Sequence, residues 1–159
     1  MSKVLVTYFS AEGTTAKVAE RLAAAIEADL FEIKPEKPYS EADINWKNPL
    51  ARCNREKIGK KDVPIVGSVE NFADYDTVLI GFPIWYYGAP NIIQTFVKQY
   101  DFSGKRIGLF ATSGGSDMGK TASKLMPFFD GKGEIVDSKL FKPTASEMEL
   151  KLWYDSLGE

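Results

Sequence analysis

The first residues able to do chemistry form a cluster of hydroxyls around one glycine. Ser10, Gly13, Thr14 and Thr15 follow the apolar run "KVLVTYF", and a helix-like pattern begins directly after them. The start of a helix has unpaired backbone N–H groups and a partial positive charge, so it can bind an anion without a lysine. Glu12 would repel a phosphate, so we expect its side chain to face solvent. We interpret the loop as a phosphate site, while simple helix capping by the same hydroxyls stays an alternative.

A second loop is rich in aromatic residues and follows the apolar run "TVLIGF". Its candidates for ligand contact are Pro83, Ile84, Trp85, Tyr86, Tyr87 and Gly88. Large aromatic side chains most often belong to a core or an interface. This run lies between a strand-like and a helix-like pattern, so at least one ring is expected at the carboxyl end of the strand. A flat ring in that place suits stacking on a planar heterocycle.

A third loop, "ATSGGSDMGKT", has three possible readings. Residues 114–121 match the G-x-x-x-x-G-K-[ST] phosphate-loop pattern, which indicates a nucleotide hydrolase. That mechanism also needs an aspartate at the end of another buried strand to hold magnesium, and the runs ending in "YFS" and "GFP" offer none. Alternatively, backbone N–H groups and small side chains border a ring system at Thr112, Ser113, Gly114 and Gly115. The third interpretation is a glycine turn before a capped helix.

Apolar runs and helix-like patterns alternate along the chain. The strand-like runs cover 3–9, 29–33, 77–82, 106–111 and 134–141, and the helix-like patterns cover 14–28, 89–100, 119–130 and 145–157. Runs that are apolar on both faces suit a parallel sheet covered by helices on each side. We therefore predict an α/β fold with an open, doubly wound, five-stranded parallel sheet in the order 2-1-3-4-5. Ligands of such sheets bind at the carboxyl ends of the strands, where all three loops are expected.

The polar stretch from Pro35 to Asn71 interrupts this alternation. It is too short for a second domain, so we expect one domain over residues 1–159 with an extended excursion between the second and third strands. Six basic residues and one acid lie within 47–61, among them Arg52 and Arg55. A solvated helix face explains this charge most simply. Docking of an acidic redox partner or of a nicotinamide nucleotide is the alternative.

Composition excludes several classes of function. Histidine is absent and Cys53 is the only cysteine, which excludes histidine-based triads, the usual zinc sites and an internal disulfide. The net charge of -2 gives no overall attraction to nucleic acid. No apolar run approaches the roughly 18 residues of a membrane span, and the first ten residues lack a secretion-signal pattern. We expect a cytoplasmic protein whose chemistry comes mostly from a bound cofactor.

The three loops together make the sequence resemble the flavodoxin-like proteins over essentially the whole chain. The resemblance implies FMN as cofactor, with its phosphate in the first loop and its isoalloxazine ring between the second and third. By resemblance, Trp85 with Tyr86 or Tyr87 would cover the flavin, and 112–115 would line its pyrimidine side. Glu12 departs from the family pattern, in which a hydroxyl residue is usual. The segment "NPLARCNRE" at 48–56 indicates a variant branch of the family.

The function implied by this resemblance is electron transfer through the bound flavin. No side chain is nominated as acid, base or nucleophile, because the cofactor carries the redox chemistry. An NAD(P)H-dependent flavin reductase, acting on quinones for example, is the main alternative, and the nucleotide hydrolase is another. The expected partner is accordingly a redox protein or a reduced nicotinamide nucleotide. The sequence does not indicate the oligomeric state.

Overall fold

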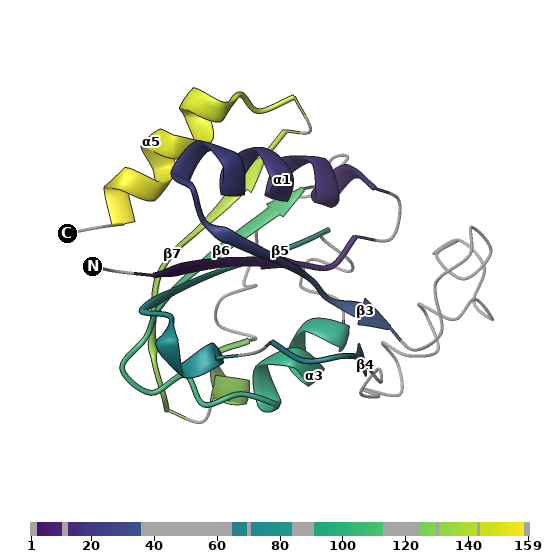
Figure 1. Ribbon diagram of the computed structural model, residues 1–159, viewed down its shortest axis with the longest axis vertical. Helices are drawn as coiled ribbons and strands as arrows, with labels where there is room; N and C mark the ends of the chain where they lie inside the picture. The colour runs from purple at the N-terminus through teal and green to yellow at the C-terminus, as the bar shows by residue number, and fades with distance from the viewer. Residues whose placement is uncertain are drawn as a thin grey trace.

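Five parallel strands form one central sheet (Figure 1). The computed structural model describes residues 3–10, 13–35, 65–69, 71–83, 91–112, 125–129, 131–142 and 144–157. The strands of the sheet are β1 (Val4–Tyr8), β2 (Asp29–Glu32), β5 (Thr77–Pro83), β6 (Arg106–Thr112) and β7 (Glu134–Phe141). Their spatial order is β2-β1-β5-β6-β7. This confirms the predicted order 2-1-3-4-5, because β3 and β4 lie outside the central sheet.

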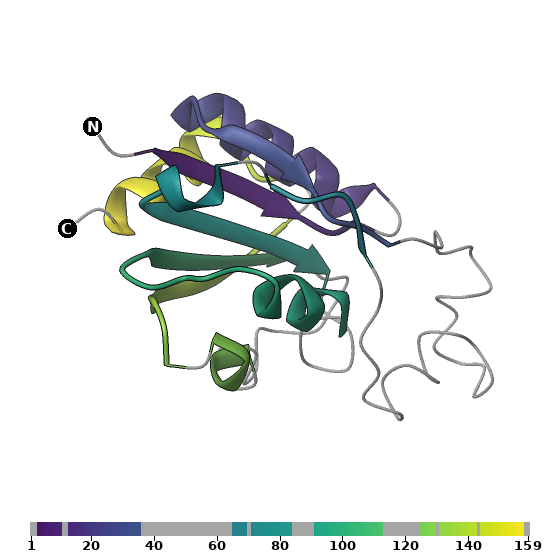
Figure 2. The ribbon, with the colours of Figure 1, turned by 60° about the horizontal axis from the view of Figure 1, so that its bottom comes forward.

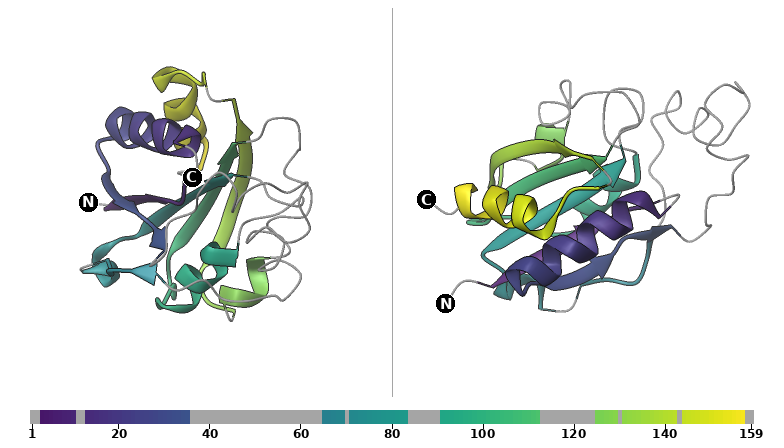
Figure 3. Two further views of the ribbon diagram at one scale, coloured as in Figure 1. Left: turned by 90° about the vertical axis from the view of Figure 1, so that its right-hand side faces the viewer. Right: turned by 90° about the horizontal axis from the view of Figure 1, so that it is seen from above.

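Helices cover both faces of the sheet. The helices α1 (Thr14–Ile26) and α5 (Glu147–Leu157) lie on one face, and α3 (Asn91–Lys98) and the 3₁₀ helix η2 (Met126–Phe129) lie on the other (Figures 1 and 2). Seen from above, α1 and α5 lie side by side (Figure 3). The Arg21 guanidinium of α1 donates a hydrogen bond to the Ala145 carbonyl just before α5, at 3.1 Å. The two helices thus form one layer over the sheet.

The central strands β5 and β6 are buried on both faces, as their continuous apolar sequence predicts. Ile80 and Leu109 pack under α3, whereas Leu79 and Phe110 pack under α1 and α5. All four side chains are fully buried. Because side chains alternate along a strand, Thr112 at the end of β6 lies on the same face as Phe110, toward α1. The alternation thus brings the polar side chain of Thr112, at the carboxyl edge of the sheet, to the start of α1.

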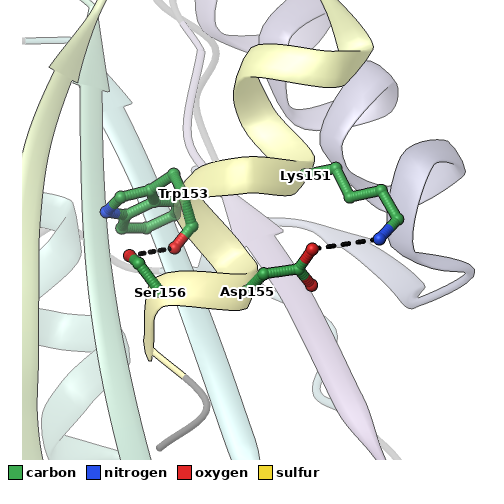
Figure 4. A network of polar contacts seen from close by, with 4 residues as sticks. All are labelled: Lys151, Trp153, Asp155 and Ser156. Atoms are coloured by element: carbon green, nitrogen blue, oxygen red, sulfur yellow. Dashed lines mark hydrogen bonds and ion pairs between the residues drawn. The ribbon is translucent and has the colours of Figure 1, made fainter.

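The edge strand β7 contains a bulge that fits it to α5. The pairing with β6 shifts between Ile107 and Gly108, and the carboxylate of Asp137 accepts a hydrogen bond from the Trp153 indole N–H at 2.9 Å. Figure 4 shows Trp153 between α5 and the strands, and on the same helix the ion pair of Lys151 with Asp155 at 3.0 Å. The Ser156 hydroxyl donates to the Trp153 carbonyl at 2.6 Å in the last turn of α5. A bulge therefore serves to satisfy a buried indole.

The excursion between β2 and β5 begins and ends in paired backbone. β3 (Lys34–Pro35) and β4 (Ile65–Val66) form a two-stranded antiparallel ladder, and the 3₁₀ helix η1 (Phe72–Asp74) leads into β5. The sequence analysis predicted the excursion but not this ladder. The basic stretch at 47–61 and the possible helix within it lie outside the described residues.

The helix bounds differ from the sequence patterns: α1 and α3 end two residues earlier than predicted, α5 starts two residues later, and residues 126–129 form a 3₁₀ helix. The helix α1 ends at Ile26, where Glu27 adopts a positive φ of 54° and closes the helix. A helix is predicted over 119–130, and the described residues near its end form the 3₁₀ helix η2. Pro127 disfavours α-helical backbone at the preceding residue and has no N–H to donate, which explains the tighter turn. Among the described residues, no helix is long and apolar enough to cross a membrane.

Candidate functional site

The carboxyl ends of β1, β5 and β6 lie next to one another. Tyr8 pairs with Gly81, and the Phe9 N–H donates to the Gly81 carbonyl at 3.0 Å, which extends the pairing by one residue. At the same edge Pro83 pairs with Thr112. The three strand ends, and with them the described residues of the predicted site, therefore meet at one edge of the sheet. Figure 2 shows β1 and β5 pointing toward this edge, away from the end of α5.

The turn into α1 is built around Gly13. Its φ of 89° lies in the left-handed region, which glycine adopts without steric cost. The Gly13 N–H donates to Ser10 Oγ at 3.0 Å, and the first bond of the helix runs from the Lys17 N–H to the Gly13 carbonyl at 3.2 Å. No described atom lies within 4 Å of the place where a Cβ of residue 13 would be. Within the described part of the chain, the side of this turn where a Cβ would lie is therefore open.

The donors at the start of α1 suit an anion. Since the helical ladder begins with the Lys17 N–H, it offers no acceptor to the amides of Thr14, Thr15 and Ala16. The Ser10 hydroxyl already accepts the Gly13 N–H, which leaves its own proton to be donated. The Gly13 N–H is engaged by Ser10, so the amides that remain for an anion are those of the first helical turn.

A buried hydroxyl pair joins the first loop to the third. Thr15 Oγ1 and Thr112 Oγ1 lie 2.7 Å apart, and their residues are 1% and 3% exposed. The sequence pattern predicts these residues at opposite ends of a ligand and does not indicate their contact. The alternation of side chains along β6 could have indicated this contact, because it places Thr112 on the face of the sheet that α1 covers.

The phenol beside this edge carries no charge at neutral pH. Tyr8 ends β1 on the α1 face and is 5% exposed. Burial, together with the smaller effect of the negative charges of Glu32 and Glu20, raises the pKa of Tyr8 to about 12. Tyr8 therefore adds no negative charge that would oppose an anion at the start of α1.

The structure describes six of the predicted site residues and brings them to one edge, namely Ser10, Gly13, Thr14, Thr15, Pro83 and Thr112. The other nine lie outside the described residues and are Glu12, Ile84, Trp85, Tyr86, Tyr87, Gly88, Ser113, Gly114 and Gly115. Ser10, Gly13, Thr14 and Thr15 belong to the loop expected to bind phosphate, whereas Pro83 and Thr112 begin the two loops expected to hold the ring. The ring-binding assignments stay predictions.

The described strands give no support to the nucleotide-hydrolase alternative. Asp137 pairs with Gly108, near the amino end of β6, and its carboxylate is bound to Trp153. Glu32 does end a strand, but it lies on the edge strand β2, where its exposed carboxylate is 3.9 Å from Lys34 Nζ. Neither acid lies where a magnesium ligand beside the third loop would be required. The 114–121 motif itself lies outside the described residues.

A family model described as flavodoxin matches residues 3–157. The chain belongs to the flavodoxin family. A protein of Bacteroides eggerthii, provisionally named a flavoprotein, is 39% identical, with a TM-score of 0.92 over 100% of this chain and 99% of its own. A similarly named protein of Bacteroides uniformis is 37% identical, with a TM-score of 0.89 over 97% and 98% of the two chains. None of the curated proteins matches this flavodoxin-family chain significantly.

A solved structure with a bound ligand is also similar. The flavoprotein of Lactobacillus acidophilus, solved in complex with FMN, is 25% identical to this chain. The match covers 97% of this chain and 99% of that protein, with a TM-score of 0.72. The likeness therefore extends over nearly the whole of both chains, and not only over part of the sheet.

Proposed function

We propose that this chain binds FMN and acts in electron transfer through the bound flavin. The observation that carries the proposal is the start of α1, where amides and hydroxyls gather at the carboxyl edge of the sheet around Gly13. Membership of the flavodoxin family supports it. The FMN complex of the Lactobacillus acidophilus relative supports it as well.

The described residues fit the phosphate end of FMN. A phosphate accepts hydrogen bonds only, and the amides of 14–16 with the Ser10 hydroxyl supply donors without a cationic side chain. The left-handed backbone of Gly13 turns the chain sharply into the helix start, where these donors gather. The positive end of the helix dipole would stabilise the negative charge further.

The protein's part in the reaction is to bind and orient the cofactor. When bound, FMN takes up electrons from a donor and passes them to an acceptor. The pairing of Tyr8 with Gly81 and of Pro83 with Thr112 would hold the loops around it at fixed distances. No described side chain is needed as a nucleophile, because the flavin carries the redox chemistry.

Exposure of the FMN-loaded protein to NADH or NADPH alone, without oxygen, tests this function. For an electron carrier we expect the flavin absorbance near roughly 450 nm to persist for minutes and to bleach on addition of dithionite. Free FMN with the same nucleotide is the control. Rapid bleaching by either nucleotide alone would contradict the carrier function and support the reductase alternative. Failure to load FMN at all would contradict both.

A further inference from the structure

The contact between Thr15 and Thr112 joins residues 97 positions apart in the sequence. Thr15 belongs to the first turn of α1, and Thr112 is the last residue of β6. Both residues are nearly inaccessible to solvent, and the two oxygens are 2.7 Å apart. A separation this short is typical of a well-formed O–H···O hydrogen bond.

The number of protons in this pair limits what it can do. Each threonine hydroxyl carries one proton and can accept as well as donate. One proton is used between the two oxygens, so the second proton remains for another acceptor. With no ligand, either hydroxyl can be the donor of the pair. The two hydroxyls therefore form a short chain of hydrogen bonds. A third group that accepts the remaining proton determines which hydroxyl donates to the other.

An anion at the start of α1 would determine which hydroxyl donates to the other. A phosphate only accepts, so Thr15 must donate to it, and Thr15 Oγ1 must then accept from Thr112. In that arrangement each hydrogen bond polarises the next and strengthens it. Riboflavin lacks the phosphate, so with riboflavin bound either hydroxyl could still donate to the other.

We propose that Thr112 is a positioning residue for the phosphate of FMN and acts through Thr15. This inference rests on the proposed FMN binding. It assigns to Thr112 a role different from lining the flavin ring, because its side chain lies on the α1 face and bonds to the first helical turn. Thr112 would thereby contribute to discrimination of FMN from riboflavin.

Affinities of the full-length variants for FMN and for riboflavin, measured by quenching of flavin fluorescence, test the proposal. Thr112→Val is expected to weaken FMN binding by about 3- to 10-fold, because one charge-assisted chain of hydrogen bonds is lost. Riboflavin affinity should change less than about twofold, and Thr112→Ser should restore the wild-type ratio. In a Thr15→Val background, Thr112→Val should cause no further loss.

Equal weakening of both ligands would overturn the proposal, since it would mean that the pair only holds the loops together. An unchanged FMN affinity in Thr112→Val would overturn it too. If Thr112→Val does not fold, Thr112→Ala serves for the same comparison of FMN and riboflavin affinities. Failure of the wild-type protein to bind FMN is a separate result, which would contradict the proposed function itself.

Discussion

Gly13→Asp is expected to lose FMN binding almost completely, whereas Gly13→Asn should keep most of it. Both side chains have nearly the same shape, and both residues tolerate the left-handed backbone that position 13 requires. Only aspartate brings a negative charge next to the proposed phosphate. At an effective dielectric constant of about 20, two charges 4 Å apart interact by about 4 kcal/mol, and solvent lowers this to roughly 2–4 kcal/mol here. The expected difference in FMN affinity is therefore about 30- to 1,000-fold.

Riboflavin is the control for Gly13→Asp. Because it carries no phosphate, the two variants should bind it within about threefold of each other. The free energies of unfolding of the two ligand-free variants should also agree closely, since no described atom lies near a Cβ at this position. Equal FMN affinities of Gly13→Asp and Gly13→Asn would show that the anion does not bind at the start of α1.

Gly81→Ala is expected to cause a large loss of stability through the addition of one methyl group. A Cβ on Gly81 would overlap Cε2 and Cζ of Phe110, whose side chain is fully buried. The ring cannot move away easily, because it packs edge-on against Trp153 with centroids 6.2 Å apart. Overpacking of this kind costs about 3 kcal/mol, which lowers the melting temperature by roughly 6–12 °C. Thermal unfolding followed by circular dichroism measures the change.

Gly108→Ala is the matched control for Gly81→Ala. Gly108 also lies in a central strand and on the same face of the sheet, but its nearest neighbour is Leu79 Cδ2 at 2.7 Å, the end of a flexible side chain. The loss of stability should be clearly smaller. Combining Gly81→Ala with Phe110→Leu should cost less than the sum of the two single changes, by at least about 1 kcal/mol. Equal losses for the two glycine variants would contradict this account of the packing.

Much of the fold could be predicted because its strands are long apolar runs with clear boundaries. The run ending at Phe82 and the run ending at Ala111 are buried on both faces, as is typical of a parallel sheet covered by helices on each side. The ladder of Lys34 and Pro35 with Ile65 and Val66 could not be predicted, since two-residue strands have no periodicity. The 3₁₀ turn at Pro127 was missed because the apolar pattern around it also fits an α-helix.

The candidate site was predictable in position but not in its hydrogen bonds. The strand order places the carboxyl ends of β1, β5 and β6 side by side, where ligands of such sheets bind. This brings Ser10, Pro83 and Thr112 to one edge. The pair of Thr15 with Thr112 depends on the rotation of α1 over the sheet, which local sequence does not determine. The same holds for the N–H of Gly13, which bonds to Ser10 because of the exact turn geometry.

The central claim is that backbone amides and hydroxyls at the start of α1 bind the anionic end of a flavin. Titration of the ligand-free protein into FMN and, in parallel, into riboflavin tests it most directly, with fluorescence quenching as the signal. We predict saturable 1:1 quenching of FMN and at least tenfold weaker binding of riboflavin, which lacks the charge that these donors would stabilise. Equal affinity for the two flavins, or no quenching of FMN, would contradict the claim.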